Sequence, residues 1–281
     1  MLARNFEVYT AESKVRDLKS VFKAMLSGLV RGRYLAYRLF IKDVKADYSR
    51  SVLGILWDFL DPIVFAAIFI LLQRGRVINS GEIHIPYVVF VVYGMLLWQT
   101  FSEALTLPLG VMQRSKTLLT QVKIPPEALL LAVFFKVLFN STFRIAVMFA
   151  LALFMDALSW VGFIKSLLLY PTIILAGMAF GVLLAPFNTI YNDIGKVVRI
   201  SLRPLLYCSP VLYAVPPARL LVYLNAVNPA GIILSNLRSL ATQNLFQNVP
   251  AFVITSALLL IIFGGGWFIF HLSIPVLSDK I

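Results

Sequence analysis

The sequence is poor in charge: 14% of its 281 residues are Asp, Glu, Lys or Arg, whereas 60% are apolar. Soluble domains carry roughly 25% charged residues, so the apolar excess needs lipid as its solvent. The apolar residues form blocks of about 20, the length that a helix needs to cross hydrocarbon roughly 30 Å thick. Ten-residue alternating segments, typical of an outer-membrane barrel, are absent. These features predict an all-α membrane protein.

Motifs that carry chemistry are also scarce. The single Cys208 cannot form an intrachain disulfide. No Gly-Lys-Ser/Thr phosphate loop occurs, so any Mg-ATP is bound by a partner, and no cofactor is predicted in this chain. His84 and His271 lie far apart in the sequence, and Asp58 and Asp61 have no third ligand nearby. No metal site and no catalytic residue is predicted.

Six spans are predicted from the apolar blocks, at Leu53–Leu72, Ile85–Leu109, Ala128–Phe154, Phe163–Phe187, Ile200–Val215 and Pro250–Leu272. The connections after the second and fourth spans are basic, and 11 of the 25 Lys and Arg residues precede Ser51. Positive charge marks the cytoplasmic side, so we expect a multi-pass protein of a bacterial inner membrane with both termini cytoplasmic. The net charge of +12 then indicates a lipid-facing end rather than a nucleic-acid partner.

The predicted organisation has four parts. Residues 1–30 form a cytoplasmic segment, 31–51 an amphipathic interface helix, 52–272 the six-helix transmembrane domain, and 273–281 a cytoplasmic tail. In the interface helix, one face carries apolar and aromatic side chains. The other face carries the cations Arg38, Lys42 and Lys45, which would lie among lipid headgroups. Tyr48, on the apolar face, is the fourth candidate residue of this helix. The alternative is an ordinary surface helix of a small cytosolic domain.

Residues 216–247 contain two apolar runs of about 8 to 14 residues, too short to span and too apolar for a free loop. Asn228-Pro229 is an N-cap and first-turn pattern, so the second run begins a helix at Pro229. We expect two short re-entrant helices that dip into the outer leaflet. A kinked seventh span is the alternative.

Several polar residues fall inside predicted spans, where charges must face protein or water. Lys136, Asn140 and Arg144 form a stripe along the third span. Glu103 lies at a depth comparable to Lys136 on the preceding antiparallel span, and these two are predicted to form a structural pair. Arg144, without an obvious partner, is a candidate for facing a polar passage or a second protomer.

Aromatic residues gather on the helices expected to line such a passage. They can stack on sugar rings, although Tyr and Trp also form interfacial belts in any membrane protein. The candidate substrate contacts are Tyr93, Trp98, Tyr207, Tyr213 and Tyr223. Gly177 and Gly181 form a small-xxx-small face suited to close helix contact.

Separated patches of the sequence coincide with one family. Tyr48–Trp57, followed by Pro62, resembles the start of the first span in permeases of type-2 ABC exporters for polysaccharides, which include the exporters of O-antigen, capsule and teichoic acid. Arg114–Glu127 resembles the family's cytoplasmic coupling segment. Tyr191–Ile194 resembles its inner connection before the fifth span, although Asn192 stands where the family usually has Arg. The similarity runs from Arg31 to Leu272 and is completed by Ser209–Tyr213, Asn228-Pro229 and Arg238.

The resemblance implies a homodimeric permease that binds two copies of an ATPase subunit and encloses a channel for a lipid-linked polysaccharide, with O-antigen as the first expectation. ATPases closing on ATP would push on the coupling segment and on the interface helix, and the re-entrant pair would shape the exit. The residues implied for coupling are Arg114, Ser115, Lys116, Leu118, Val122, Lys123, Pro125, Glu127, Asn192 and Asp193.

Other readings remain open at this point. The chain could be a type-2 ABC permease for capsule, teichoic acid, a lipid or a drug. A secondary transporter would show internal repeats with broken spans in both halves, whereas a re-entrant stretch is predicted in one half only. A membrane glycosyltransferase or acyltransferase is disfavoured because no carboxylate or His constellation occurs.

Overall fold

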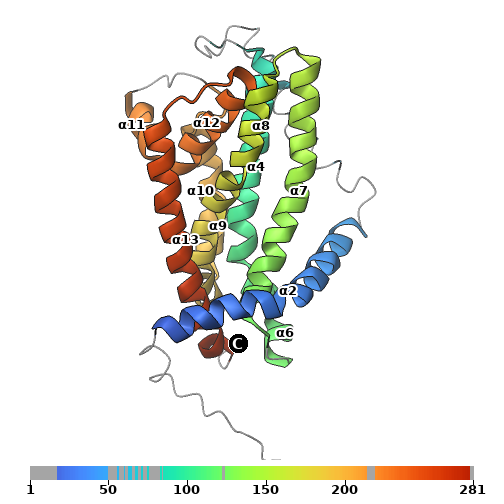
Figure 1. Cartoon of the computed structure of the whole chain (residues 1–281), viewed down its shortest axis with the longest axis vertical. Coiled ribbons are helices and arrows are strands. Elements are labelled where there is room, and N and C mark those ends of the chain that lie inside the picture. Colours follow the sequence, from blue (N-terminus) through green and yellow to red (C-terminus); the bar gives the residue numbers. More distant parts are fainter. Residues whose placement is uncertain are drawn as a thin grey trace, which may run out of the picture.

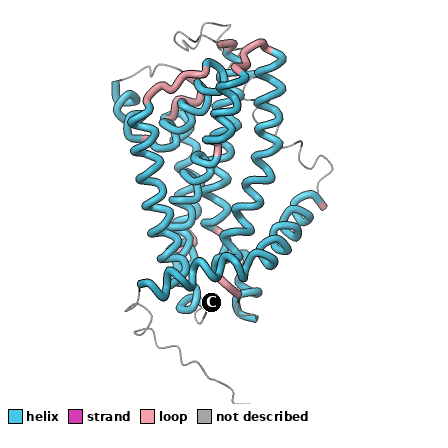
Figure 2. Tube along the Cα trace, in the orientation of Figure 1, coloured by secondary structure: helices cyan, strands magenta, loops and turns pink. Residues whose placement is uncertain are grey.

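A computed structural model gives the fold, and it describes residues 18–49, 85–121, 124–213 and 219–278 together with isolated positions between 56 and 83. Within these ranges the regular structure is helical throughout. The long helices run side by side in one bundle, and helix α2 (Leu18–Tyr48) lies across its lower end (Figures 1 and 2). The prediction of an all-α protein is confirmed.

Four helical stretches among the described residues are long and apolar enough to cross a membrane. They agree with the second, third, fourth and sixth predicted spans: α4 (Tyr87–Leu109), α7 (Pro126–Phe154), α8 (Trp160–Leu169) joined to α9 (Pro171–Ile190), and α13 (Val249–Ser278). The predicted first span, Leu53–Leu72, lies almost entirely outside the described residues. The chain is therefore a multi-pass membrane protein, and the count of six spans is not confirmed.

The predicted fifth span needs correction. Instead of Ile200–Val215, the helix found here is α10, Asp193–Cys208, and it is not among the stretches apolar enough to cross a membrane. Its 16 residues rise about 24 Å, short of the roughly 30 Å of hydrocarbon. Three basic residues in its first three turns lower its hydropathy, and the apolar run after Cys208 turns instead of continuing the helix.

The lower end of the bundle gathers segments that are distant in the sequence (Figure 1). Beside α2 lie two short helices from the connection between α4 and α7, namely α5 (Val111–Arg114) and α6 (Lys116–Gln121). The C-terminal end of α13 lies at the same end, as the contact between α6 and α13 requires. These are the connections that the charge pattern assigned to one side of the membrane.

Helix α2 begins earlier than predicted, at Leu18 rather than Arg31, so the expected boundary between residues 30 and 31 falls inside one continuous helix. Small residues explain its close packing: Gly32 and Ala36 lie against Ala128 and Ala132 of α7. Away from this contact, apolar side chains such as Phe22 are exposed beside exposed cations. This division of the surface is the one expected of a helix at a membrane interface.

Two short helices follow α10, as predicted. Helix α11 spans Arg219–Val227 and α12 spans Pro229–Gln243. The Asn228 side chain caps α12 by accepting a bond from the Gly231 N–H at 3.3 Å, and the helix ends at Asn244 in the left-handed conformation. Both helices lie at the upper end of the bundle, where α12 packs against α4, α8, α9 and α13 (Figure 1).

Helices α4 and α9 make the most extensive contact in the bundle core, and it is a close one. A Cβ added at Gly177 would lie 2.5 Å from the carbonyl oxygen of Phe101, and one at Gly181 would lie 2.3 Å from that of Leu105. Only glycine permits this approach, which confirms the small-xxx-small prediction.

Replacing Gly177 with Ala should therefore push α4 and α9 apart and destabilise the fold by about 1–3 kcal/mol, as overpacking does. Thermal unfolding of the purified protein in detergent measures the effect. Gly264→Ala is the matched control, because nothing lies within 4 Å of the added Cβ there. Equal melting temperatures for the two variants would refute the close α4–α9 contact.

Candidate functional site

Two connections meet at the lower end of the bundle through side-chain amides, of which Asn188 is buried. Asn188 of α9, only 3% exposed, donates from Nδ2 to the Leu109 carbonyl at 2.9 Å and accepts at Oδ1 from the Gly195 N–H at 2.7 Å. Gln113 of α5 donates to the Asn188 carbonyl at 2.8 Å and also to Asn192 Oδ1. The connection after α4 and the turn before α10 thus form one unit.

Beside this unit, a cleft of about 290 Å³ opens between α2, α5, α6 and α7. Its polar wall combines Lys42 and Asp43 of α2 with Arg114 and Ser115. The Arg114 guanidinium turns back and donates from Nη2 to the Leu107 carbonyl at 2.5 Å. Partial desolvation of the guanidinium in this cleft lowers the pKa of Arg114, although part of the side chain stays exposed, and the carboxylates of Asp43 and Asp47 oppose that lowering.

The predicted coupling residues therefore gather at this end, though not all on its surface. Arg114, Lys116, Asn192 and Asp193 are exposed, while Ser115 and Leu118 are half-buried. The half-buried Pro125 is the N-cap residue of α7. Val122 and Lys123 lie outside the described residues.

Glu127 departs from the prediction that it meets a partner protein. It is 1% exposed, and its Oε1 lies 2.6 Å from Nδ1 of His271 near the end of α13. Gly28 of α2 faces the same carboxylate, since a Cβ there would lie 2.3 Å from Oε2. Glu127 therefore joins α2, α7 and α13 inside the protein.

The intramembrane charges pair differently from the prediction, and the expected Glu103–Lys136 pair is wrong. Glu103 Oε2 lies 2.7 Å from Arg144 Nη1, and Asn140 donates to its other oxygen. Lys136 instead reaches Asp47 of α2, with 2.5 Å between Nζ and Oδ2. The reason is helical phase: four residues turn a helix by about 400°, so the stripe rotates about 80° over eight residues, from facing α2 to facing α4.

The aromatic candidates divide into two groups. Tyr93 and Trp98 are 2% and 4% exposed, inside the apolar core around α4, so the prediction that they face a channel does not hold. Tyr207 at the end of α10 and Tyr223 of α11 are exposed. The Tyr213 hydroxyl donates to the Tyr207 carbonyl at 3.0 Å, which holds the turn after α10 against that helix.

Helix α10 carries an exposed polar face. Lys196, Arg199, Arg203 and Tyr207 follow one another at three- or four-residue spacing, which places them along one side of the helix. Lys196 pairs with Asp193 at 2.9 Å on the surface. Neither arginine forms an ion pair with any residue that the structure describes.

At the upper end, Arg238 of α12 is buried and meets no carboxylate among the described residues. Its Nη2 donates to the Pro210 carbonyl at 2.8 Å, and its guanidinium lies 3.4 Å from the centroid of the Phe90 ring. Burial lowers its pKa to about 9, so it stays charged at neutral pH. Arg238 thus fixes the turn after α10 onto α4 and α12.

No protein-family model matches the chain. The O-antigen export system permease protein RfbA of Klebsiella pneumoniae is 28% identical over 180 residues, which cover 62% of this chain and 66% of that protein. RfbA of Myxococcus xanthus is 27% identical over 190 residues, covering 66% of this chain and 70% of the relative. This chain is a homologue of O-antigen export permeases. The alignments span about two thirds of each relative, and the family resemblance read from the sequence is confirmed.

In this permease homologue, several residues of the candidate site could not be picked out from the sequence. Gln113, Asn188 and His271 act through partners that are distant in the chain, so no local pattern marks them. Arg199 and Arg203 did carry a signal, because their spacing matches one helix face. Arg203 was obscured because it falls inside the segment predicted as the fifth span, whereas Arg199 was assigned to the connection before that span.

The buried Glu103–Arg144 pair gives a direct test of the packing between α4 and α7. Arg144→Met should cost about 3–5 kcal/mol of unfolding free energy, because it leaves a buried carboxylate unpaired. Lys136→Met should cost less than about 1 kcal/mol, since its partner Asp47 is half exposed. Thermal unfolding compares the two, and adding Glu103→Gln to Arg144→Met should restore part of the loss. A larger effect at Lys136 would contradict the observed pairing.

Proposed function

We propose that the chain is the transmembrane subunit of an ATP-driven exporter that moves a lipid-linked polysaccharide, most simply O-antigen, across the inner membrane. Two copies form the channel, and two copies of an ATPase subunit bind Mg-ATP and drive it. The homologous permeases support this class of function. Within the molecule, the observation that carries the proposal is the exposed cationic face of α10.

That face is incompatible with lipid as its neighbour. Arg203 lies ten residues after Asp193, so it stands about 15 Å above the lower end of α10. An arginine at such depth has to face protein or a water-filled cavity. In one copy of the chain the face is exposed, so a second copy across the path supplies the other wall. A homodimeric channel would give the arginines a water-filled path to face and would place a second copy of the chain on its other side.

The chemistry of this wall suits a glycan with an anionic link to its lipid carrier. Arginine recognises phosphate through paired donors, and Lys196 adds charge near the lower mouth. Tyr207 continues the same face beyond the arginines, where an aromatic ring can stack on passing sugars without fixing them. Tyr223 on α11 is exposed too, and in this proposal it extends the surface toward the upper exit.

The ATPase is proposed to bind at the lower end, on the surface formed by α5, α6 and the turn before α10. Both termini are then cytoplasmic. The amide unit of Gln113, Asn188 and Asn192 joins the docking connection to the first turn of α10. A push on α5 and α6 therefore moves the base of the channel helix directly. The cleft beside α2 leaves room for that movement.

The double variant Arg114→Glu with Lys116→Glu should lose the ATPase. It replaces two cations of the proposed docking surface with two carboxylates, which would repel the charges that the cations attract. We expect at least about tenfold less co-purified ATPase, since such juxtapositions cost several kcal/mol. Lys165→Glu, at the upper end, is a single charge-reversal control and should retain it. Normal association of the double variant would place the docking surface elsewhere.

The double variant Arg199→Glu with Arg203→Glu should reduce surface polysaccharide about tenfold or more in a deletion strain, while the ATPase stays bound. Immunoblotting of the exported glycan and pull-down of the ATPase report the two properties separately. Tyr207→Ala tests stacking without changing charge. Unchanged export in all these variants would exclude α10 as the channel wall, and loss of capsule in place of O-antigen would change the assigned substrate.

A further inference from the structure

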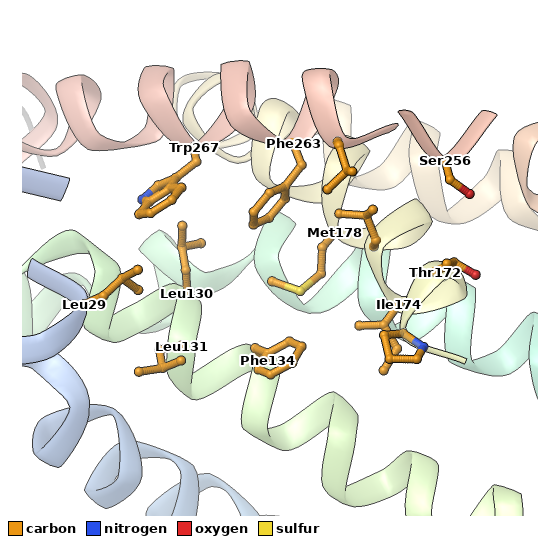
Figure 3. Close-up of a pocket in the computed structure, with 13 residues that line it drawn as sticks. Leu29, Leu130, Leu131, Phe134, Thr172, Ile174, Met178, Ser256, Phe263 and Trp267 are labelled. Carbon is orange, nitrogen blue, oxygen red and sulfur yellow. The ribbon is translucent and has the colours of Figure 1, made fainter. Parts of the chain in front are cut away.

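An apolar groove lies between α7, α9 and α13, and α2 closes its lower end (Figure 3). Its volume is about 490 Å³. Phe134, Met178 and Phe263 form its middle, and it opens to the outside at Leu260, which is 58% exposed. Neither the coupling end nor the α10 face includes any of these residues.

The groove has the depth of one lipid leaflet. On α13 its lining runs from Ser256 to Trp267, eleven residues further along the helix, which is a rise of about 16 Å. This is about half of the roughly 30 Å of hydrocarbon. Leu29 of the interface helix and Trp267 stand at the same end in Figure 3, so the groove starts where headgroups lie and ends near the bilayer centre.

Water does not suit this space. A buried water needs two to four polar partners, whereas the lining is almost wholly apolar, and an empty groove would forfeit dispersion contacts along its whole length. The Trp267 indole N–H has no hydrogen-bond partner among the described residues and is covered by neighbouring atoms, so an acceptor in the groove reaches it only after a small shift of the ring. Ser256 Oγ is also unpartnered, but a helical serine can turn back to a carbonyl of its own helix, which an indole cannot do.

The occupant must therefore be a hydrocarbon chain that carries a hydrogen-bond acceptor at its outer end. An exposed cation stands near that end, because Arg33 follows Leu29 by one turn on the same side of α2. Acyl chain, ester carbonyl and phosphate in this order describe a glycerophospholipid. A polyprenyl phosphate offers no carbonyl at the depth of the indole.

We propose that the groove holds one acyl chain of a glycerophospholipid from the leaflet that α2 contacts. The ester carbonyl accepts a hydrogen bond from Trp267 Nε1, and the phosphate lies beside Arg33. The lipid fills the space between α13 and the α7–α9 pair and so completes the bundle. This site is separate from the exported substrate and does not depend on the proposed function.

Photo-crosslinking of the full chain tests the proposal. The protein is reconstituted in phosphatidylglycerol that carries a diazirine on its acyl chain, irradiated and mapped by peptide mass spectrometry. Label should concentrate on peptides with Phe134 and Met178. Leu260→Trp should fill the mouth and remove most of that label. Ile261→Trp, on the neighbouring exposed residue outside the lining, should leave it unchanged.

Trp267→Phe keeps the aromatic volume and removes the donor. It should weaken retention of phosphatidylglycerol during delipidation about threefold to tenfold, which corresponds to the loss of one hydrogen bond. Native mass spectrometry counts the lipid molecules that stay bound. Equal groove labelling in the two Trp-insertion variants would overturn the proposal. So would groove labelling by a diazirine-polyprenyl phosphate but not by the phospholipid, or crosslinks there between two copies of the chain.

Discussion

The cost of an unsatisfied charge in hydrocarbon governs this structure. With no water available, each cation within the bundle needs a partner inside the protein. Arg144 finds one in Glu103, and Arg238 finds carbonyls and the Phe90 ring. Lys136 reaches a carboxylate on the interface helix. The arginines of α10 find none within the described chain, and this exception is what makes that helix the candidate channel wall.

Close contacts between helices also suggest how a movement of the lower connections could reach α10 in the proposed mechanism. Helices α4 and α9 are held together at Gly177 and Gly181 without intervening side chains. At their lower ends, Asn188 bonds both to α4 and to the first turn of α10. The buried Glu127–His271 contact links α7 and α13 beside α2. In the proposed mechanism, a displacement of the connection between α4 and α7 would be transmitted by close helix contact and by short buried side chains such as Asn188.

Much of the fold could be predicted from the sequence because apolar blocks of membrane length are a strong signal. Helices α4, α7, α9 and α13 were found where the blocks lie, and α12 began at Pro229 as its cap predicted. The charge pairing could not be predicted, because it depends on the phase and register of packed helices. Local pattern also failed at Glu127, whose charge suggested a surface contact although it is buried.

The α10 segment shows a different limit. Lys196 and Arg199 were read as part of an inner connection, and Ile200–Val215, which contains Arg203, was read as a span. In the structure both belong to one amphipathic helix that ends at Cys208. Sequence hydropathy averages over such a helix, whereas only the packing against α4 and α9 shows which side is left exposed.

The central claim is that the Arg199–Arg203 face of α10 borders an aqueous path. Cysteine scanning of α10 in a Cys208→Ser background, with a membrane-impermeant thiol reagent applied to the assembled exporter, tests it most directly. The account predicts reactive positions at 199, 203 and 207 and protected positions at Ile194 and Val198, which lie toward the core. Uniform protection along the helix, as lipid-facing cysteines would show, would contradict it.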